Sequence, residues 1–120
     1  MTMQTLTIYE LPPTLNALNN MHHMTRAKTK EHWSSMIERA CIQYGIKPVK
    51  RVSITLELYF PDKRRRDLDN YSGLGFKFLM DGLVDNGILP DDSINEVVEL
   101  RIIPGGISKP PHMLIHIQEV

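Results

Sequence analysis

The stretch from Arg51 to Phe60, RVSITLELYF, alternates between polar and apolar side chains along its whole length. Successive side chains of a β-strand point to opposite faces, so this stretch predicts a strand with one buried face and one largely wet face. Pro61-Asp62 ends the strand, because proline has no N–H to give to a neighbouring strand. A run of four cations follows directly, from Lys63 to Arg66.

A strand, a loop and a helix are predicted before this stretch. Residues 3–9 are rich in β-forming residues and predict a first strand, which Pro12-Pro13 ends. Residues 14–25 carry asparagines and histidines and predict a loop. A helix is predicted from about Ala27, with Gly45 as its stop. Its core face is formed by apolar residues at helical spacing: Trp33, Ile37, Ala40, Cys41 and Tyr44.

A second helix and two more strands are predicted after the basic run. The helix begins near Asp69, with Asp69 or Asn70 as N-cap, and ends at Asn86-Gly87, before a loop over 88–93. Its apolar face consists of Leu74, Phe78 and Leu79, widened by Phe76, Met80 and Leu83. Strands are predicted over 95–103 and 112–119, with a turn at Pro104-Gly105-Gly106. Their alternating apolar residues are Val98, Leu100 and Ile102 in the first, and Met113, Ile115 and Ile117 in the second.

The predicted order is β-α-β-α-β-β, which indicates an α/β fold of the α+β type: a single mixed sheet with two helices, in one domain spanning residues 1–120. The single cysteine, Cys41, cannot form an intramolecular disulfide, which suits a reducing compartment. The N-terminus does not have the pattern of a signal peptide, and no apolar run approaches the roughly 20 residues of a membrane span. We therefore expect a cytoplasmic protein without a membrane segment.

The charges balance overall but are unevenly distributed. Lys and Arg number 14, as do Asp and Glu, which alone argues weakly against nucleic-acid binding. Between Lys47 and Arg66, however, seven basic residues stand against two acidic ones, and between Asp81 and Glu99 lie six acidic residues and no basic ones. Two surfaces of opposite sign suit a phosphodiesterase, which needs cations for phosphates and carboxylates for a metal. A chance distribution in a small protein is the competing interpretation.

The carboxylates that could carry chemistry lie in two groups, Asp67 with Asp69 and Asp91 with Asp92. Magnesium prefers oxygen ligands and is usually held by a few carboxylates plus water and substrate phosphate. Such a metal can orient a water molecule and polarise a phosphodiester. The alternatives are a helix cap at Asp69 and a solvated loop at Asp91-Asp92. An EF-hand is excluded, because Tyr71 and Phe78 stand where its fifth and twelfth residues belong.

The run from Phe60 to Asn70, FPDKRRRDLDN, resembles the signature of the RusA family of Holliday-junction resolvases. The downstream segment Gly82-(x)4-Gly87-Ile88-Leu89-Pro90-Asp91-Asp92 is similar to that family's second acidic motif, and Pro12-Pro13-Thr14-Leu15-Asn16 to its N-terminal segment. The resemblance implies that Asp67, Asp69 and Asp92 are catalytic metal-binding carboxylates, with Asp91 as a further ligand. It also implies a homodimer that uses Mg²⁺ or Mn²⁺ to cut four-way DNA junctions symmetrically in recombination and repair.

One departure from the family concerns a lysine that commonly follows the second aspartate of the first motif by four residues. This sequence has Gly73 there. Lys77 lies one helical turn further on, and we hypothesise that it reaches back to take a catalytic role near the scissile phosphate. The residues expected to bind DNA are Lys63, Arg64, Arg65, Arg66, Asn70, Asn16, Arg26 and Lys28.

The spacing of the two acidic motifs suggests that they meet across a dimer. Asp69 and Asp92 flank a helix of about 17 residues, which is roughly 25 Å long at ~1.5 Å per residue. The loop after this helix would have to be almost fully extended to return Asp92 to Asp69. If the helix pairs antiparallel with its copy across a two-fold axis, the first motif of one chain meets Asp91 and Asp92 of the other. The sequence therefore predicts composite metal sites.

Three other functions remain open at this point. The first is a binding protein for branched DNA that cuts poorly or not at all, the second a nuclease for flaps or other branched substrates, and the third a metal-binding protein without a DNA role. The basic run 63–66 argues against the third. His22 and His23 could be ligands or DNA contacts, although loop histidines are more often bystanders.

Overall fold

A computed structural model describes residues 2–120 and, within them, four strands and three helices. No helix in this part of the chain combines the length and the apolar character that a membrane crossing requires. The elements in chain order are β1 (Met3–Ile8), α1 (Leu15–Asn19), α2 (His23–Gln43), β2 (Val52–Phe60), α3 (Asp69–Asp85), β3 (Val97–Ile107) and β4 (His112–Glu119).

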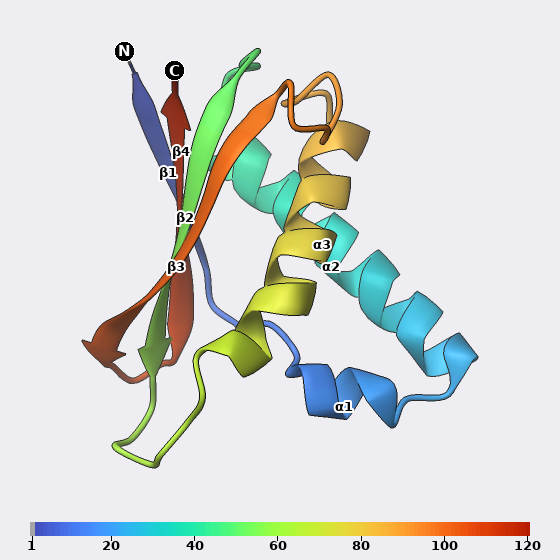
Figure 1. Cartoon of the computed structure of the whole chain (residues 1–120), viewed down its shortest axis with the longest axis vertical. Coiled ribbons are helices and arrows are strands. Elements are labelled where there is room, and N and C mark those ends of the chain that lie inside the picture. The colour runs from blue at the N-terminus through green and yellow to red at the C-terminus, as the bar shows by residue number, and fades with distance from the viewer. Residues whose placement is uncertain (1) are drawn as a thin grey trace.

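The strands form one mixed sheet, as predicted, in the order β1-β4-β2-β3. β4 is antiparallel to both β1 and β2, whereas β2 and β3 are parallel and are joined through α3. The helices cover one face of the sheet, and the other face is bare (Figure 1). The fold is therefore α+β, with β2 in the interior of the sheet and the crossover helix α3 beside it.

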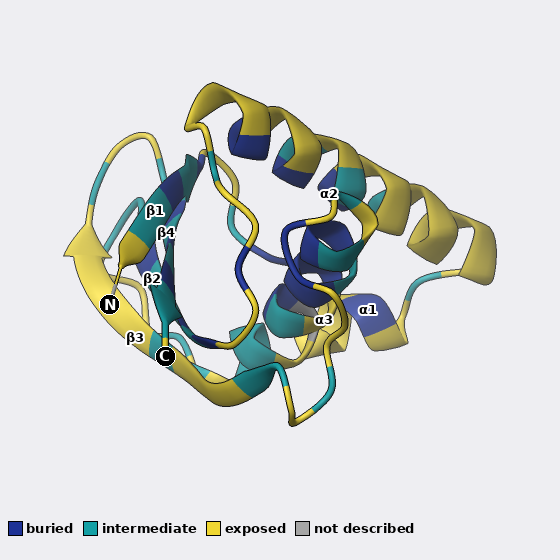
Figure 2. Cartoon of the chain, turned by 90° about the horizontal axis from the view of Figure 1, so that it is seen from above, coloured by how far each residue is buried: buried dark blue, intermediate teal, exposed yellow. Residues whose placement is uncertain are grey.

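The alternation that predicted β2 is confirmed. Its four apolar residues from Val52 to Leu58 are fully buried, as are the three alternating residues of β4, Met113, Ile115 and Ile117. Leu6 and Ile8 of β1 are buried as well. In Figure 2 this buried side of the sheet faces the buried sides of α2 and α3, so one core lies between the two layers.

The core faces of the two long helices are largely as predicted. Trp33, Ile37, Ala40 and Cys41 of α2 are buried, as are Phe78, Leu79, Met80 and Leu83 of α3. The prediction for Tyr44 was wrong: this residue is the C-cap of α2 and is 39% exposed, because the helical turns end at Gln43. The side chain of Leu74, also predicted to face the core, lies outside what the structure describes.

The predicted loop over 14–25 is wrong, because it contains α1 and the first residues of α2. Polar side chains at two helix starts explain this difference. Thr14 Oγ1 accepts a hydrogen bond from the backbone N–H of Ala17 at 3.1 Å, and so caps α1. His22 Nδ1 accepts one from the backbone N–H of Met24 at 3.3 Å, so α2 begins four residues earlier than predicted. Residues 2–120 therefore contain three helices rather than two.

Strand β3 differs from its prediction in its bounds and in the position of Val98. A register shift opposite Val52 and Ser53 places Val97 beside the core and leaves Val98 exposed. Leu100 lies opposite Ile54 but is 46% exposed, because β3 is an edge strand. The predicted turn at Pro104-Gly105-Gly106 is part of the strand, which an edge position allows because a proline there need not donate a hydrogen bond.

The bare face of the sheet carries a chain of polar side chains. His116 lies between Thr5 and Glu57, with its Nδ1 2.9 Å from Thr5 Oγ1 and its Nε2 2.8 Å from Glu57 Oε1. Tyr59 donates its hydroxyl proton to Glu57 Oε2 at 2.6 Å. The hydrogen bonds from Tyr59 and His116 lower the pKa of Glu57. These contacts satisfy the polar face of β2 that the sequence predicted to be wet.

Helices α2 and α3 approach each other closely at Gly82. A Cβ built there would lie 3.0 Å from Ile37 Cβ and from Ile37 Cγ2, closer than side chains normally pack. We expect Gly82→Ala to lower the free energy of unfolding by about 1–3 kcal/mol through overpacking. Gly73→Ala is the matched control, because a Cβ at Gly73 meets only Leu15 Cδ1 at 3.8 Å. That variant should gain about 0.5–1 kcal/mol from helix propensity.

Urea unfolding of the two variants beside the parent protein checks this prediction. Equal stabilities for the two variants would contradict the close packing of α2 on α3.

Candidate metal and DNA site

The loop between β2 and α3, residues 61–68, is held by the guanidinium group of Arg66. This group donates to Asp62 Oδ1 at 2.8 Å and to the main-chain carbonyls of Asp62 and Arg64 at 3.1 and 2.9 Å. It also lies over the ring of Phe60, 4.6 Å from the centroid. A planar fork can bond several acceptors at once in this way. Arg66 therefore shapes the loop that carries the first acidic motif.

Asp62 is a structural residue of this site that the sequence reasoning did not single out. The backbone N–H of Arg64 and then the guanidinium of Arg66 lower the pKa of its carboxyl group. Its spacing to Arg66, i to i+4, was visible in the sequence. Outside a helix, however, this spacing brings two side chains together only when the loop folds back on itself, as it does here.

Asp67 and Asp69 stand at the start of α3 and are exposed. The predicted capping role of Asp69 or Asn70 is wrong, because the N-cap position is Leu68 and no side chain that the structure describes caps this end. The first turn begins earlier, with backbone bonds from Asn70 N–H to Asp67 O and from Tyr71 N–H to Leu68 O, both 3.1 Å. Two carboxylates thus face solvent at a helix N-terminus, where the partial positive charge of the helix favours anionic groups.

A cavity of about 330 Å³ opens beside Asp67. It is lined by Arg65, Arg66, Asp67, Asn70 and Tyr71. The backbone N–H of Asn16, at the start of α1, approaches Asn70 Oδ1 at 3.4 Å, so the N-terminal segment reaches the same place. The fold therefore brings the first acidic motif, part of the basic run and Asn16 together, whereas the sequence alone left the position of Asn16 open.

The second acidic motif lies at the other end of α3 (Figure 1). Its preceding residues are tied to that end, since the backbone N–H groups of Ile88 and Leu89 both donate to Leu83 O. Its following residues are tied to the start of β2, through Val52 N–H and Glu96 O at 2.8 Å. Asp91 and Asp92 are exposed in between. Within residues 2–120, no group of three His, Cys, Asp or Glu side chains is arranged to hold a metal ion.

The predicted DNA-binding cations fall into two groups. Lys63, Arg64 and Arg65 are exposed next to the first motif, whereas Arg26 and Lys28 lie exposed on the first turns of α2. Arg26 also donates to Leu18 O at 3.1 Å, which ties α2 to α1.

Lys77 has a partner of its own. Its Nζ lies 3.2 Å from Asp81 Oδ1, one turn further from Asp69, so its role near the scissile phosphate stays a prediction. His22 and His23 lie together with ring centroids 4.2 Å apart, and His22 serves as the cap of α2.

The sequence is similar to crossover junction endodeoxyribonucleases named RusA. Those of Escherichia coli strain K12, Escherichia coli O6:H1 strain CFT073 and Shigella sonnei strain Ss046 are each 32% identical to it over 92 residues. The aligned part spans 76% of this chain and 69% of each relative. The chain belongs to the RusA family. No protein-family profile matches it.

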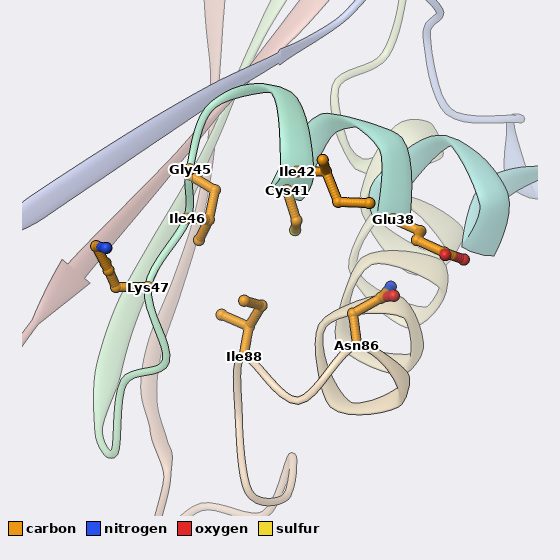
Figure 3. Close-up of a pocket in the computed structure, with 8 residues that line it drawn as sticks. All are labelled: Glu38, Cys41, Ile42, Gly45, Ile46, Lys47, Asn86 and Ile88. Carbon is orange, nitrogen blue, oxygen red and sulfur yellow. The ribbon is translucent and has the colours of Figure 1, made fainter.

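Another cavity, of about 390 Å³, lies between the end of α2 and residues 86–88 (Figure 3). That cavity contains Cys41, and burial raises the pKa of the thiol to about 11. A thiol is nucleophilic only as the thiolate, so Cys41 remains protonated and unreactive at neutral pH. The thiol in this cavity therefore offers no nucleophile.

The role of Arg66 in shaping the RusA-type loop can be tested by Arg66→Lys. A single ammonium group cannot reach the three acceptors that the guanidinium bonds, so we expect several-fold faster amide hydrogen exchange over residues 62–68. Arg65→Lys, at an exposed neighbouring position, is the control and should leave exchange unchanged. Mass spectrometry of the peptide that covers the loop provides the measurement. Equal amide exchange rates in the two variants would show that Arg66 does not hold this loop.

Proposed function

We propose that this protein is a metal-dependent endodeoxyribonuclease that resolves four-way (Holliday) DNA junctions by paired, symmetric phosphodiester hydrolysis. The observation that carries the proposal is the pair of exposed carboxylates, Asp67 and Asp69, at the start of α3 in a RusA-family chain. Asp67 shares a cavity with Arg65 and Arg66. The relatives are named for cutting crossover junctions, and the site has the groups that such a reaction needs.

The residues present fit a magnesium or manganese ion. Asp67 and Asp69 supply carboxylate oxygens, which Mg²⁺ prefers, and one or two protein carboxylates suffice when water and substrate phosphate complete the shell. Such an ion, when bound, lowers the pKa of a coordinated water and polarises the phosphorus. Around it the chain contributes the basic residues Lys63, Arg64 and Arg65, which attract the DNA backbone and offset the charge that develops on the phosphate.

The second motif completes the site across a homodimer in this proposal. The argument rests on the position of Asp91 and Asp92 at the far end of α3, which is roughly 25 Å long at ~1.5 Å per residue. Three residues from the tied Leu89 to Asp92 can span about 10 Å at most, so one chain cannot bring Asp92 to Asp69. A two-fold axis that sets α3 against its copy would bring each first motif to the partner's second motif.

A binding protein for branched DNA on the same fold is the second candidate. It is favoured by one observation, the loss of the family's lysine at Gly73 together with the engagement of Lys77 by Asp81. Such a protein would hold a junction tightly and cut it slowly or not at all.

Cleavage of a synthetic four-way junction separates these candidates. In Mg²⁺ we expect paired symmetric nicks in the junction and none in a linear duplex of the same sequence. Asp69→Asn keeps the size of the side chain but removes its charge, so the cleavage rate should fall roughly 10²–10³-fold while junction binding persists. Tight binding without nicks by the parent protein would favour the binding protein.

Composite sites predict that two inactive variants restore each other. Asp69→Asn and Asp92→Asn each disable both sites of their own homodimer. In a mixed dimer with sites built across the interface, one site collects both substitutions and the other has neither. When the two variants are mixed under subunit exchange, about half of the dimers are mixed, and each of these has one intact site of its two. About a quarter of all sites should therefore be active, and they should make single nicks rather than paired ones. If both motifs acted within one chain, no mixture would regain activity.

Gly73→Lys returns the family's lysine to its usual position. The exposed helical site has room, with only Leu15 Cδ1 at 3.8 Å from a new Cβ. We expect the cleavage rate to rise about ten-fold from a positioned cation near the phosphate. Gly73→Ala is the control, because it shares the gain in helix propensity without the charge. Equal rates for the two variants would contradict this expectation.

The same variant tests the hypothesis for Lys77. Lys77→Ala should slow cleavage in the parent protein, and the same substitution should matter less when it is combined with Gly73→Lys. An unchanged rate in Lys77→Ala would rule out the catalytic role of Lys77.

A further inference from the structure

A second cleft, of about 400 Å³, lies where the three helices meet. Leu18 of α1 and Phe78 of α3 are buried residues that line it, and the first turns of α2 form one side. Its charged residues are Arg26 and Lys30 from α2 and Lys77 and Asp81 from α3, with His23 beside them. The cleft is separate from the cavity of the first acidic motif, and Lys77 is the one residue among those that line it to which the proposed reaction gives a role.

The cleft has more positive than negative charge. Asp81 is the one carboxylate among the described residues that line it, 3.7 Å from Lys30 Nζ and 3.2 Å from Lys77 Nζ. The lysine side chains are 57% and 63% exposed, whereas that of Asp81 is 20% exposed. With Arg26 also lining the cleft, three cations face one anion, and both lysine side chains are more exposed than that of Asp81. Such a cleft favours an anionic ligand.

The position of the cleft fits the backbone of a DNA strand at the proposed metal site. Lys77 follows Asp69 by eight residues on the same helix, or about 12 Å at ~1.5 Å per residue. One strand of a DNA duplex carries a phosphate about every 3.4 Å along the axis, so this distance corresponds to three or four nucleotides.

The surface between the two sites is also open. Asn70, Gly73 and Lys77 follow one another at helical spacing along α3. Gly73 is exposed and has no side chain to interrupt this line.

We propose that this cleft binds a backbone phosphate of one junction arm, three or four nucleotides from the cut. Lys30, Arg26 and Lys77 contact the phosphate, and Asp81 is the internal counter-ion that the phosphate replaces. An exposed ion pair contributes little stability, so a phosphate that accepts charge-assisted hydrogen bonds from several cations displaces it at small cost. This assignment rests on the proposed function, because it presumes that the ligand at the first motif is DNA.

Junction binding in Ca²⁺, measured by fluorescence anisotropy at several salt concentrations, tests the assignment without cutting. Lys30→Ala should weaken binding several-fold and lower the slope of log K against log salt by about one. Asp81→Asn should strengthen binding, because it removes the competing carboxylate while keeping the size of the side chain. Opposite changes in junction affinity for the two variants are the diagnostic result.

Arg39→Ala is the matched control. It removes one charge from the same helix, nine residues along and therefore on the opposite side, where Arg39 lines a separate cavity with residues of β1. Its affinity and salt slope should equal those of the parent protein.

Three results would overturn the assignment. The first is a salt slope of Lys30→Ala equal to that of Arg39→Ala, and the second is weaker binding by Asp81→Asn with a lower melting temperature, which would make the ion pairs structural only. The third is loss of the dimer in Lys30→Ala by light scattering, which would make the cleft a contact between copies. If the parent protein binds a junction no better than linear duplex, the proposed function itself fails, which is a separate outcome.

Discussion

The close packing of α3 against its neighbours is the constraint on which the rest of the molecule depends. A Cβ at Gly75 would lie 3.1 Å from Leu56 Cδ1, and one at Gly82 would lie 3.0 Å from Ile37, so two glycines let α3 lie flush on β2 and α2. A helix held along its length in this way cannot bend at little cost. Its ends therefore fix where the two acidic motifs stand, and they stand apart.

The position of α3 also shows where the balanced charges of this chain lie. The basic run precedes α3, and the acidic stretch from Asp81 to Glu99 begins in its last turns and continues beyond it. The run from Lys63 to Arg66 therefore lies at one end of α3 and most of the acidic stretch lies at the other, where Lys50 and Arg51 also lie because β2 begins there. Two such chains related by a two-fold axis with α3 antiparallel would bring opposite charges together at both ends, which favours this arrangement over a parallel one. In the proposed homodimer, the attraction between these charges would add to the pairing of the two acidic motifs.

Much of the sheet was predictable from local sequence patterns. The period-two alternation of β2 and β4 located both strands and their buried faces, because burial of one face leaves little freedom of register. The prediction failed where a tertiary contact outweighs a local signal. Pro104-Gly105-Gly106 has the composition of a turn, but the ring of Tyr59 packs where a Cβ at Gly105 would be, 2.5 Å from its Cζ. At this edge of the sheet the glycine serves close packing instead.

The sequence predicted which residues belong to the candidate site, but it did not predict which of them shape the loop and which remain exposed. The four cations from Lys63 to Arg66 look alike in sequence, yet Arg66 uses its guanidinium on Asp62 and the loop, whereas Arg64 and Arg65 remain exposed. Only the folded loop distinguishes them. Asp69 likewise looks like a cap, and only the earlier start of the first turn leaves its carboxylate available.

The pairing of Lys77 with Asp81 does not decide against a catalytic lysine. An i, i+4 ion pair on a helix surface is worth about 0.3–0.5 kcal/mol. A hydrogen bond to a charged phosphate is worth about 1.5–3 kcal/mol, so bound DNA outweighs the pair several-fold. The side chain of Lys77 can therefore leave Asp81 when a phosphate arrives on either side. Because the cleft and the first motif lie along one line of α3, Lys77 lies between the two phosphate positions proposed above, and the DNA strand that occupied them would decide which phosphate it contacts.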